Sequence, residues 1–185
     1  ARRVFTNLGR LIMEWFVLDR MSLAEIERFV EVRGLGHLTR ALEQGRGVVM
    51  ISAHFGNWEV LPMTLSAKGF KGGVLARPLR YPEYQRFLWG MRQRKGVPTY
   101  DRRSLKDVAR VLAQNHIIGI MPDQDIDSLE GIFVDFFGRP TYTPIGPAAL
   151  ALMTGAALIP AVVIRQGRRF RLVIDEPLSV ERTED

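Results

Sequence analysis

Short apolar runs alternate with longer stretches of helical spacing along most of the chain. The mostly apolar runs at 48–52 and 117–121 are typical of buried strands. The same patterns predict further strands at 73–76, 157–165 and 169–175, an extended segment at 131–137, and helices at 57–68, 82–95, 104–114 and 145–154. The turn Gln166-Gly167-Arg168 predicts a C-terminal β-hairpin. This alternation predicts an α/β fold with a mixed, mostly parallel sheet flanked by helices.

The first 45 residues show helical spacing without strands. The predicted helices lie at 4–17, 22–33 and 36–44. Ser22 followed by Glu25 is a capping box, which marks the start of the second helix. We expect a single domain over 1–185, with a helical, membrane-facing part at 1–45 and an α/β catalytic part at 46–185.

The composition is that of a folded domain without disulfides. With 46% hydrophobic and 25% charged residues over 185 positions, the chain can bury a sizeable core and is not a disordered protein. It contains no cysteine, which excludes disulfides, thiolate metal ligands and a cysteine nucleophile. No run of about 18 apolar residues is present, so we expect no segment that spans a bilayer. The chain begins ARRVFTNLG, and we expect a fragment that attaches to the membrane either peripherally, through its apolar first helices, or by an anchor in a segment outside this sequence.

Positive charge is concentrated in one segment. The formal net charge is +6, yet residues 77–110 alone carry ten basic and three acidic side chains. A local positive field attracts anionic partners, which include phosphorylated substrates, anionic lipids, acidic proteins and nucleic acid.

A histidine and a glutamate follow the predicted strand at 48–52. In open α/β sheets, ligands bind beyond the carboxyl ends of the strands, and His54 lies there. Glu59 falls in the first turn of the next predicted helix, and Gly56 permits a turn that brings the two side chains together. Such a pair can act as a general base and its orienting carboxylate. The alternative is that His54 packs or caps while Glu59 complements the helix dipole.

HFGNWE resembles the H-x4-D/E signature of the glycerolipid acyltransferase superfamily, and the chain more narrowly resembles the bacterial lipid A biosynthesis (late) acyltransferases. Further segments match that family in order over roughly residues 45–175: LARPLRYPEY, WGMRQRKG, MPDQDID, GIFVDFFGRPTYTPIGPAALA and AALIPAVV. The resemblance implies acyl transfer from an acyl-carrier-protein thioester to a hydroxyl of a lipid A precursor or related lipid. It also implies a monomer without metal or other cofactor and without nucleic acid, at the cytoplasmic face of the bacterial inner membrane.

The resemblance assigns roles to individual residues. His54 becomes the general base and Glu59 the group that orients it. The candidate substrate-binding residues are Arg77, Arg92, Arg94, Asp123 and Asn57. In this scheme the arginines bind phosphate or developing negative charge, because a guanidinium matches phosphate oxygens. Asp123 shapes the acceptor pocket or positions loops near His54, and Asn57 is also the predicted N-cap of its helix.

Two other functions fit parts of the pattern. Asp123 and Asp125 form a D-x-D sequence that suits a metal-dependent glycosyltransferase, whereas a calcium loop fails for want of Gly at position 128 and Glu at position 134. A non-catalytic module could instead bind anionic lipid or nucleic acid through 77–110. The apolar residues at 132–137 either line an acyl-chain tunnel or form a core strand, and the pattern favours the core strand.

Overall fold

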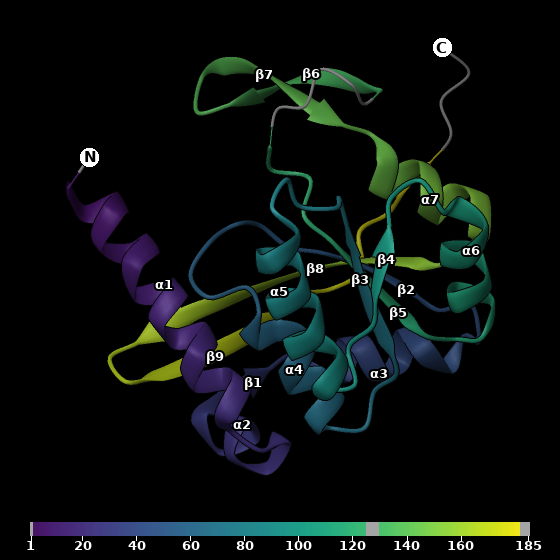
Figure 1. The fold of residues 1–185 in the computed structure, drawn as a ribbon. Helices are drawn as coiled ribbons and strands as arrows, with labels where there is room; N and C mark the ends of the chain where they lie inside the picture. Colours follow the sequence, from purple (N-terminus) through teal and green to yellow (C-terminus); the bar gives the residue numbers. More distant parts are fainter. Residues whose placement is uncertain (1, 125–129, 182–185) are drawn as a thin grey trace.

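One mixed sheet organises the part of the chain that the computed structural model describes, residues 2–124 and 130–181 (Figure 1). Its strands are β1 (Val30–Arg33), β2 (Val48–Ile51), β3 (Gly72–Ala76), β4 (Thr99–Asp101), β5 (Ile117–Ile120), β8 (Ala157–Gln166) and β9 (Arg169–Ile174). Their order is β1-β9-β8-β2-β5-β3-β4. Neighbours are parallel except β8 and β9, which form the predicted C-terminal hairpin. The predicted fold class is therefore confirmed.

Helices cover both faces of this sheet. They are α1 (Arg2–Arg20), α2 (Leu23–Phe29), α3 (Leu35–Glu43), α4 (Val60–Ala67), α5 (Pro82–Arg94), α6 (Leu105–Ala113) and α7 (Gly146–Thr154). Because side chains alternate along a strand, Val48 and Met50 pack into a core with α1 to α5, whereas Val49 packs with α6 and α7. Strand β2 is thus buried on both faces, as its apolar run predicts.

The register between β2 and β5 determines what meets beyond their ends. The two strands are parallel, with Val48 opposite Ile117 and Ile51 opposite Ile120. Both strands therefore end at the same level, and residues equally far past each end come close together. This edge of the sheet holds the site described below.

Three elements of the main sheet and its flanking helices differ from the sequence predictions. The predicted helix at 22–33 ends at Phe29, because Val30 and Val32 alternate with charged residues and pair as β1 with β9. The short strand β4 was not predicted, since three residues give little pattern. Helix α4 begins at Val60 instead of Asn57, and Glu59 occupies the N-cap position without a capping hydrogen bond from its side chain.

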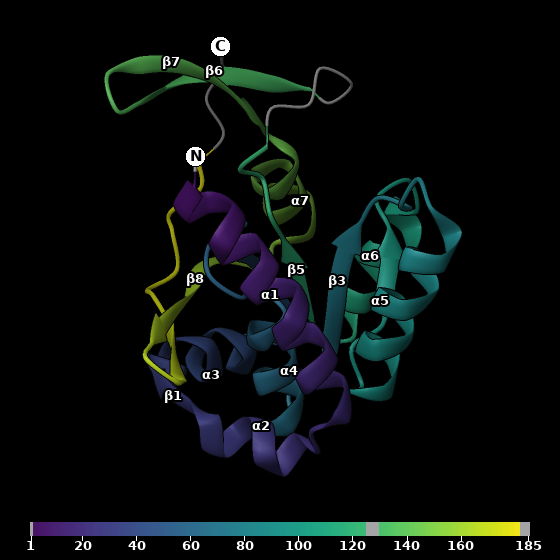
Figure 2. The same cartoon turned by 60° about the vertical axis from the view of Figure 1, so that its left-hand side comes forward.

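A separate hairpin stands away from the main sheet (Figures 1 and 2). It consists of the antiparallel strands β6 (Gly131–Phe136) and β7 (Arg139–Pro144). The prediction of a core strand at 132–137 is wrong, because Phe133 is 71% exposed and Phe137 at the tip is 91% exposed. Nothing in the spacing of an apolar run distinguishes a strand inside a core from one covered by another partner.

Helix α1 lies across the domain with one apolar face outward. Its buried positions include Leu11 and Leu18, while the exposed apolar side chains are Val4, Phe5, Leu8, Ile12, Met13, Phe16 and Val17. Figures 1 and 2 both show the first turn of α1 at the same end of the molecule as the β6–β7 hairpin. None of the helices in the described ranges combines the length and hydropathy needed to traverse a bilayer.

Candidate active site

His54 and Asp123 meet at the carboxyl edge of β2 and β5. Each lies three residues past its strand, so the parallel register brings them together. The backbone N–H of His54 donates to Asp123 Oδ2 at 2.7 Å, and His54 Nδ1 lies 2.8 Å from Asp123 Oδ1. An ionised carboxylate only accepts hydrogen bonds, so Nδ1 is the donor, and in the neutral form of the ring Nε2 then has a free lone pair. The imidazole is 30% exposed, which leaves it accessible.

The loop after β2 holds the imidazole from a second side. Trp58 meets His54 edge to face, with ring centroids 4.9 Å apart. Gly56 turns the loop with φ of 61°, and a Cβ there would lie 2.4 Å from the carbonyl oxygen of Val163. Only glycine satisfies both the positive φ and this close approach to β8. The chain does turn at Gly56, as predicted, but the turn brings Trp58 and not Glu59 against His54.

Glu59 has a different partner from the one that the sequence predicts. Arg92 donates from Nε to Glu59 Oε2 at 2.8 Å and from Nη2 to Oε1 at 2.5 Å. The Glu59 side chain is 1% exposed and that of Arg92 6% exposed, so this is a buried bidentate ion pair between the α4 N-cap and α5. The carboxylate at Nδ1 of His54 belongs to Asp123. The guanidinium of Arg92, predicted to bind phosphate, is occupied by Glu59.

Asn57 and Arg94, two further predicted substrate-binding residues, both hydrogen-bond to residues of α1. Asn57 is fully buried, and its Nδ2 donates to Glu14 of α1 at 3.0 Å. Arg94 ends α5, the helix that leads from β3 to the parallel strand β4, so it lies toward the amino ends of the strands. Its Nη2 donates to Asp19 Oδ1 at 2.6 Å, which fastens the last turn of α1. Arg94 therefore lies away from the His54 edge of the fold, whereas Asn57 belongs to the same loop as His54.

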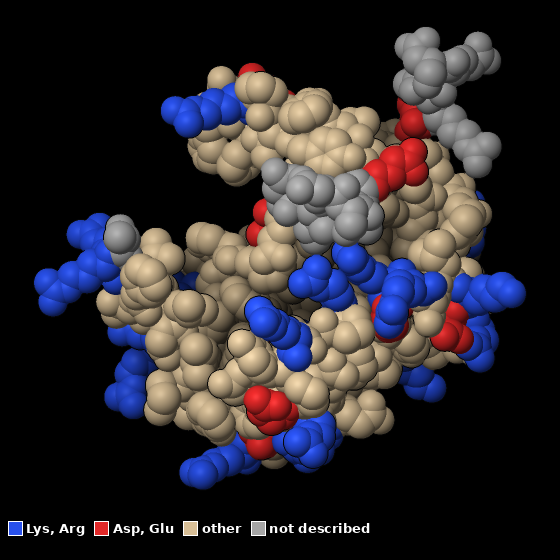
Figure 3. Space-filling view, turned by 45° about the horizontal axis from the view of Figure 1, so that its top comes forward, with Lys and Arg blue, Asp and Glu red and all other residues tan. Residues whose placement is uncertain are grey.

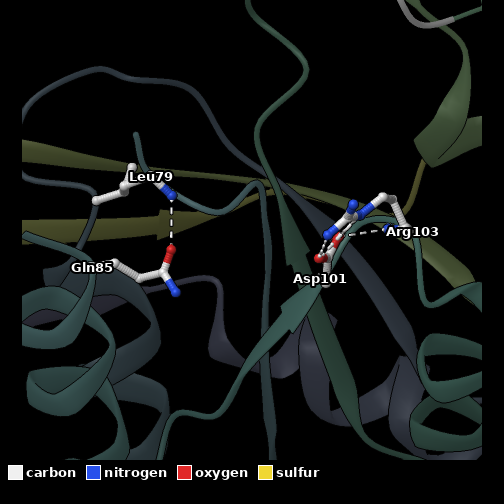
Figure 4. Close-up of polar contacts among 4 residues, drawn as sticks. All are labelled: Leu79, Gln85, Asp101 and Arg103. Atoms are coloured by element: carbon white, nitrogen blue, oxygen red, sulfur yellow. Dashed lines mark hydrogen bonds and ion pairs between the residues drawn. The ribbon is translucent and has the colours of Figure 1, made fainter. Parts of the chain in front are cut away.

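Arg77 retains the position that anion binding needs. It follows β3 directly, at the same strand-end edge as His54, and is exposed. Its side chain makes no hydrogen bond or ion pair to the residues that the structure describes. The loop that carries it is braced, because the backbone N–H of Leu79 donates to Gln85 Oε1 at 2.9 Å (Figure 4).

At the end of β4, Arg103 is already engaged by Asp101 (Figure 4). Hydrogen bonds from its side chain and backbone lower the pKa of Asp101 from 3.8 to about 2. The carboxylate is therefore ionised at neutral pH and neutralises Arg103. Arg103 thus has a carboxylate partner, whereas Arg77 has none among the residues that the structure describes.

The wider edge is basic and concave. Figure 3 shows Lys and Arg side chains gathered over α5 and the ends of β3 and β4, with the surface hollowed between them and α1. A second hollow, of about 390 Å³, opens at the amino ends of the strands and is lined by residues that include Lys71, Pro98 and His116. Because it lies at the other edge of the sheet, that hollow is separate from His54.

Asp125, the second aspartate of the D-x-D sequence, lies outside the described residues. The sequence predicted only a general role near His54 for Asp123. The apolar runs that form β2 and β5 did carry a signal for their contact, because His54 and Asp123 follow these runs at equal distances. Equal offsets from the ends of two neighbouring parallel strands predict contact, once the strands are known to be neighbours. Trp58 and Glu14 were not predicted at all.

Comparison with known proteins gives a consistent match along the chain. The model of the family described as bacterial lipid A biosynthesis acyltransferase matches residues 1–185. The chain is 35% identical over 171 residues to a phosphatidylinositol mannoside acyltransferase of Mycobacterium tuberculosis (strain CDC 1551 / Oshkosh), covering 88% of this chain and 53% of that protein. It is 30% identical over 185 residues to the lipid A biosynthesis lauroyltransferase of Escherichia coli K12, covering 94% and 57%.

A third relative, the phosphatidylinositol mannoside acyltransferase of Mycolicibacterium smegmatis, is 33% identical over 168 residues, which cover 86% of this chain and 54% of that protein. The chain thus spans about half the length of the curated relatives that it matches.

Proposed function

The chain belongs to the bacterial lipid A biosynthesis acyltransferase family, and from this premise we propose that it moves a fatty acyl chain from an acyl-carrier-protein thioester to a hydroxyl of a glycolipid. The observation that carries the proposal is the accessible His54 with its Nδ1 2.8 Å from Asp123 Oδ1, an arrangement in which Nε2 of the neutral ring can accept a proton. Family membership supports acyl transfer over the glycosyltransferase and non-catalytic alternatives, since the matched relatives are named acyltransferases.

In the proposed reaction His54 acts as a general base and then as a general acid. Nε2 takes the proton of the acceptor hydroxyl as its oxygen attacks the thioester carbonyl carbon. The tetrahedral intermediate collapses, the C–S bond breaks, and the imidazolium returns the proton to the thiolate. The products are an ester and a free thiol, so no other reactant is needed. Asp123 fixes the tautomer and stabilises the imidazolium between the two steps.

Other groups of the site suit the charges of such substrates. The backbone N–H groups around Gly56 are the candidate donors to the oxyanion, because Arg92 is occupied by Glu59. Arg77 is the candidate ligand for a phosphate of the acceptor or of the donor's phosphopantetheine. An acidic carrier protein would be attracted to the basic edge seen in Figure 3, with an association rate that falls as salt rises.

The acceptor class follows from the names of the relatives. One is named for acyl transfer to phosphatidylinositol mannoside and another for lipid A biosynthesis. Both lipids carry sugar hydroxyls and phosphate, so we propose a lipid A precursor or a related phosphorylated glycolipid as acceptor. The test incubates full-length protein with acyl-carrier-protein thioesters and a panel of both lipid types, and measures product mass. A mass gain of one acyl group supports the proposal, and its absence on every acceptor refutes it.

Replacing Asp123 with asparagine should lower kcat by about 10²–10⁴-fold while the fold survives. An amide at this position can donate to Nδ1, which would stabilise the tautomer whose Nε2 is protonated and unable to accept. Single-turnover acyl transfer measures the loss. Asp101→Asn is the matched control, because Asp101 ends the outer strand β4 and contacts Arg103 instead of His54. Equal activity of Asp123→Asn and the control would contradict the assignment.

We further propose peripheral attachment to the cytoplasmic face of the inner membrane through α1 and the β6–β7 hairpin. An isolated two-stranded hairpin is at best marginally stable in water, which indicates that another surface covers its apolar side chains. Phe137 has a positive φ of 53°, which is unfavourable for a bulky residue, and it places an aromatic ring at the tip with 91% exposure. Basic residues of the same end complement an anionic bilayer (Figure 3).

Replacing Phe136 and Phe137 with serine should weaken binding to anionic vesicles by about 10-fold or more, because each ring buries large apolar area in the interface. Sedimentation with phosphatidylglycerol-containing vesicles measures this. Phe29→Ser is the control, since Phe29 is 46% exposed but ends α2, at the opposite end of the molecule (Figure 2). Unchanged vesicle binding by the hairpin variant would refute membrane attachment through the hairpin.

A further inference from the structure

Helix α1 carries a carboxylate on its inner face. Leu11 and Leu18 are the buried residues of this helix, and Glu14 lies between them on the same stripe, at helical spacings of three and four residues. A carboxylate in such a position is costly unless it is paired and hydrogen-bonded. Its partners therefore identify what the helix is fastened to.

Glu14 joins two parts of the site region. Its Oε2 accepts from Asn57 Nδ2 at 3.0 Å and from Arg165 Nη2 at 2.8 Å, and Arg165 Nη1 donates to Oε1. Asn57 belongs to the loop after β2. Arg165 belongs to β8, and its guanidinium lies over the ring of Phe170. One carboxylate thus ties the loop that contains His54 to the helix and to the neighbouring strand.

Trp15, the residue after Glu14, is connected to the imidazole of His54 through Trp58. The ring of Trp15 lies edge to face against Trp58 at 6.0 Å, and Trp58 lies edge to face against His54 at 4.9 Å. The buried side-chain atoms that lack a hydrogen-bond partner in the described ranges, Trp15 Nε1 and Asn57 Oδ1, belong to this same cluster. Unpaired buried polar atoms cost stability, so the arrangement is not the most stable one for an anchored helix.

We infer that Glu14 is a positioning residue: it holds Asn57, and through the loop it keeps Trp58 against His54. The imidazole then has Asp123 at Nδ1 and Trp58 at its ring, which restricts its rotation while Nε2 stays accessible. The inference deepens the proposed acyl transfer and rests on it. Asp19 supplies a natural comparison, because it pairs with Arg94 from the same helix but contacts no residue of the His54 loop.

The test compares full-length variants Glu14→Gln and Asp19→Asn. A glutamine presents an amide N–H to the Arg165 guanidinium, which breaks the two-pronged contact. We expect Glu14→Gln to lower kcat by about 10- to 100-fold with little change in KM, as for a misplaced catalytic group. Asp19→Asn should leave kcat unchanged. If both variants lose thermal stability equally and neither loses kcat, Glu14 only anchors the helix and the inference fails.

A reciprocal exchange provides the rescue. Asn57→Asp alone sets two carboxylates against each other, whereas Glu14→Gln combined with Asn57→Asp restores the hydrogen bond between the two positions with donor and acceptor exchanged. The double variant should recover most of the lost kcat. No recovery, with a folded double variant, would overturn the role assigned to the Glu14–Asn57 hydrogen bond.

Two measurements need no substrate and separate this inference from the proposed function. The rate at which diethyl pyrocarbonate modifies His54, followed by peptide mass, should rise several-fold in Glu14→Gln. The circular dichroism of the Trp15–Trp58 pair should weaken in that variant and persist in Asp19→Asn. Wild-type protein inactive on every acceptor would refute the proposed function, while unchanged His54 reactivity and unchanged dichroism in Glu14→Gln would refute the positioning role.

Discussion

Replacing His54 with alanine is expected to abolish acyl transfer while leaving the fold intact. The imidazole lies in a loop outside both hydrophobic cores, so its loss leaves the packing of the cores unchanged. General-base assistance is typically worth about 10²–10⁴-fold in rate, and within 2–124 and 130–181 we expect no second base to replace it, because the Asp123 carboxylate then lacks the ring that connects it to the acceptor. Transfer from a radiolabelled acyl-carrier-protein thioester, with the protein in excess, measures the remaining single-turnover rate.

His37→Ala is the matched control for this experiment. His37 lies on α3, with its Nδ1 3.0 Å from Arg40 Nη2, and contributes nothing to the strand-end edge. Its replacement should leave the rate unchanged, and both variants should melt within a few degrees of the wild type. A His54→Ala protein that transfers acyl groups at the wild-type rate would exclude the mechanism, whatever the acceptor.

The sequence predicted the position of His54 better than its surroundings. An apolar run followed by a small polar pair and a histidine indicates a strand end, and local spacing suffices for that conclusion. The partner of the imidazole depends on which strand lies beside β2, and strand order is a property of the whole sheet. Local sequence therefore favoured Glu59, five residues away, over Asp123, 69 residues away.

The lack of information about distant contacts also explains the errors in the predicted fold. Val30–Arg33 alternates like a strand, but a four-residue pattern following a capped helix is weaker than the helical spacing before it. At 132–137 the sequence shows that the residues are apolar, but it does not show whether they lie in the core or on the surface. Burial of an apolar strand requires a partner surface, and in the described residues β6 pairs only with β7. Glu14 did carry a signal, since a carboxylate on an apolar helical stripe demands a partner.

The second large effect concerns Glu59 and stability. Glu59→Ala would leave the Arg92 guanidinium buried without its carboxylate, and breaking such a pair typically costs about 3–5 kcal/mol of unfolding free energy. That is a large share of the roughly 5–15 kcal/mol that stabilises an ordinary domain. Urea unfolding followed by circular dichroism should therefore show a midpoint far below that of the wild type. A midpoint within experimental error of the wild type would mean that the ion pair contributes nothing to the fold.

Loss of activity in Glu59→Ala cannot by itself distinguish a structural from a chemical role, because an unfolded protein is also inactive. Replacing both members, Glu59→Met with Arg92→Met, removes the unpaired charge and fills the space with apolar side chains of similar length. Such exchanges of buried ion pairs are often neutral or even stabilising by about 1–4 kcal/mol. If Glu59 serves the fold, acyl transfer should return together with stability, since His54 and Asp123 are unchanged. If Glu59 instead acts on the imidazole, the double variant will fold and remain inactive.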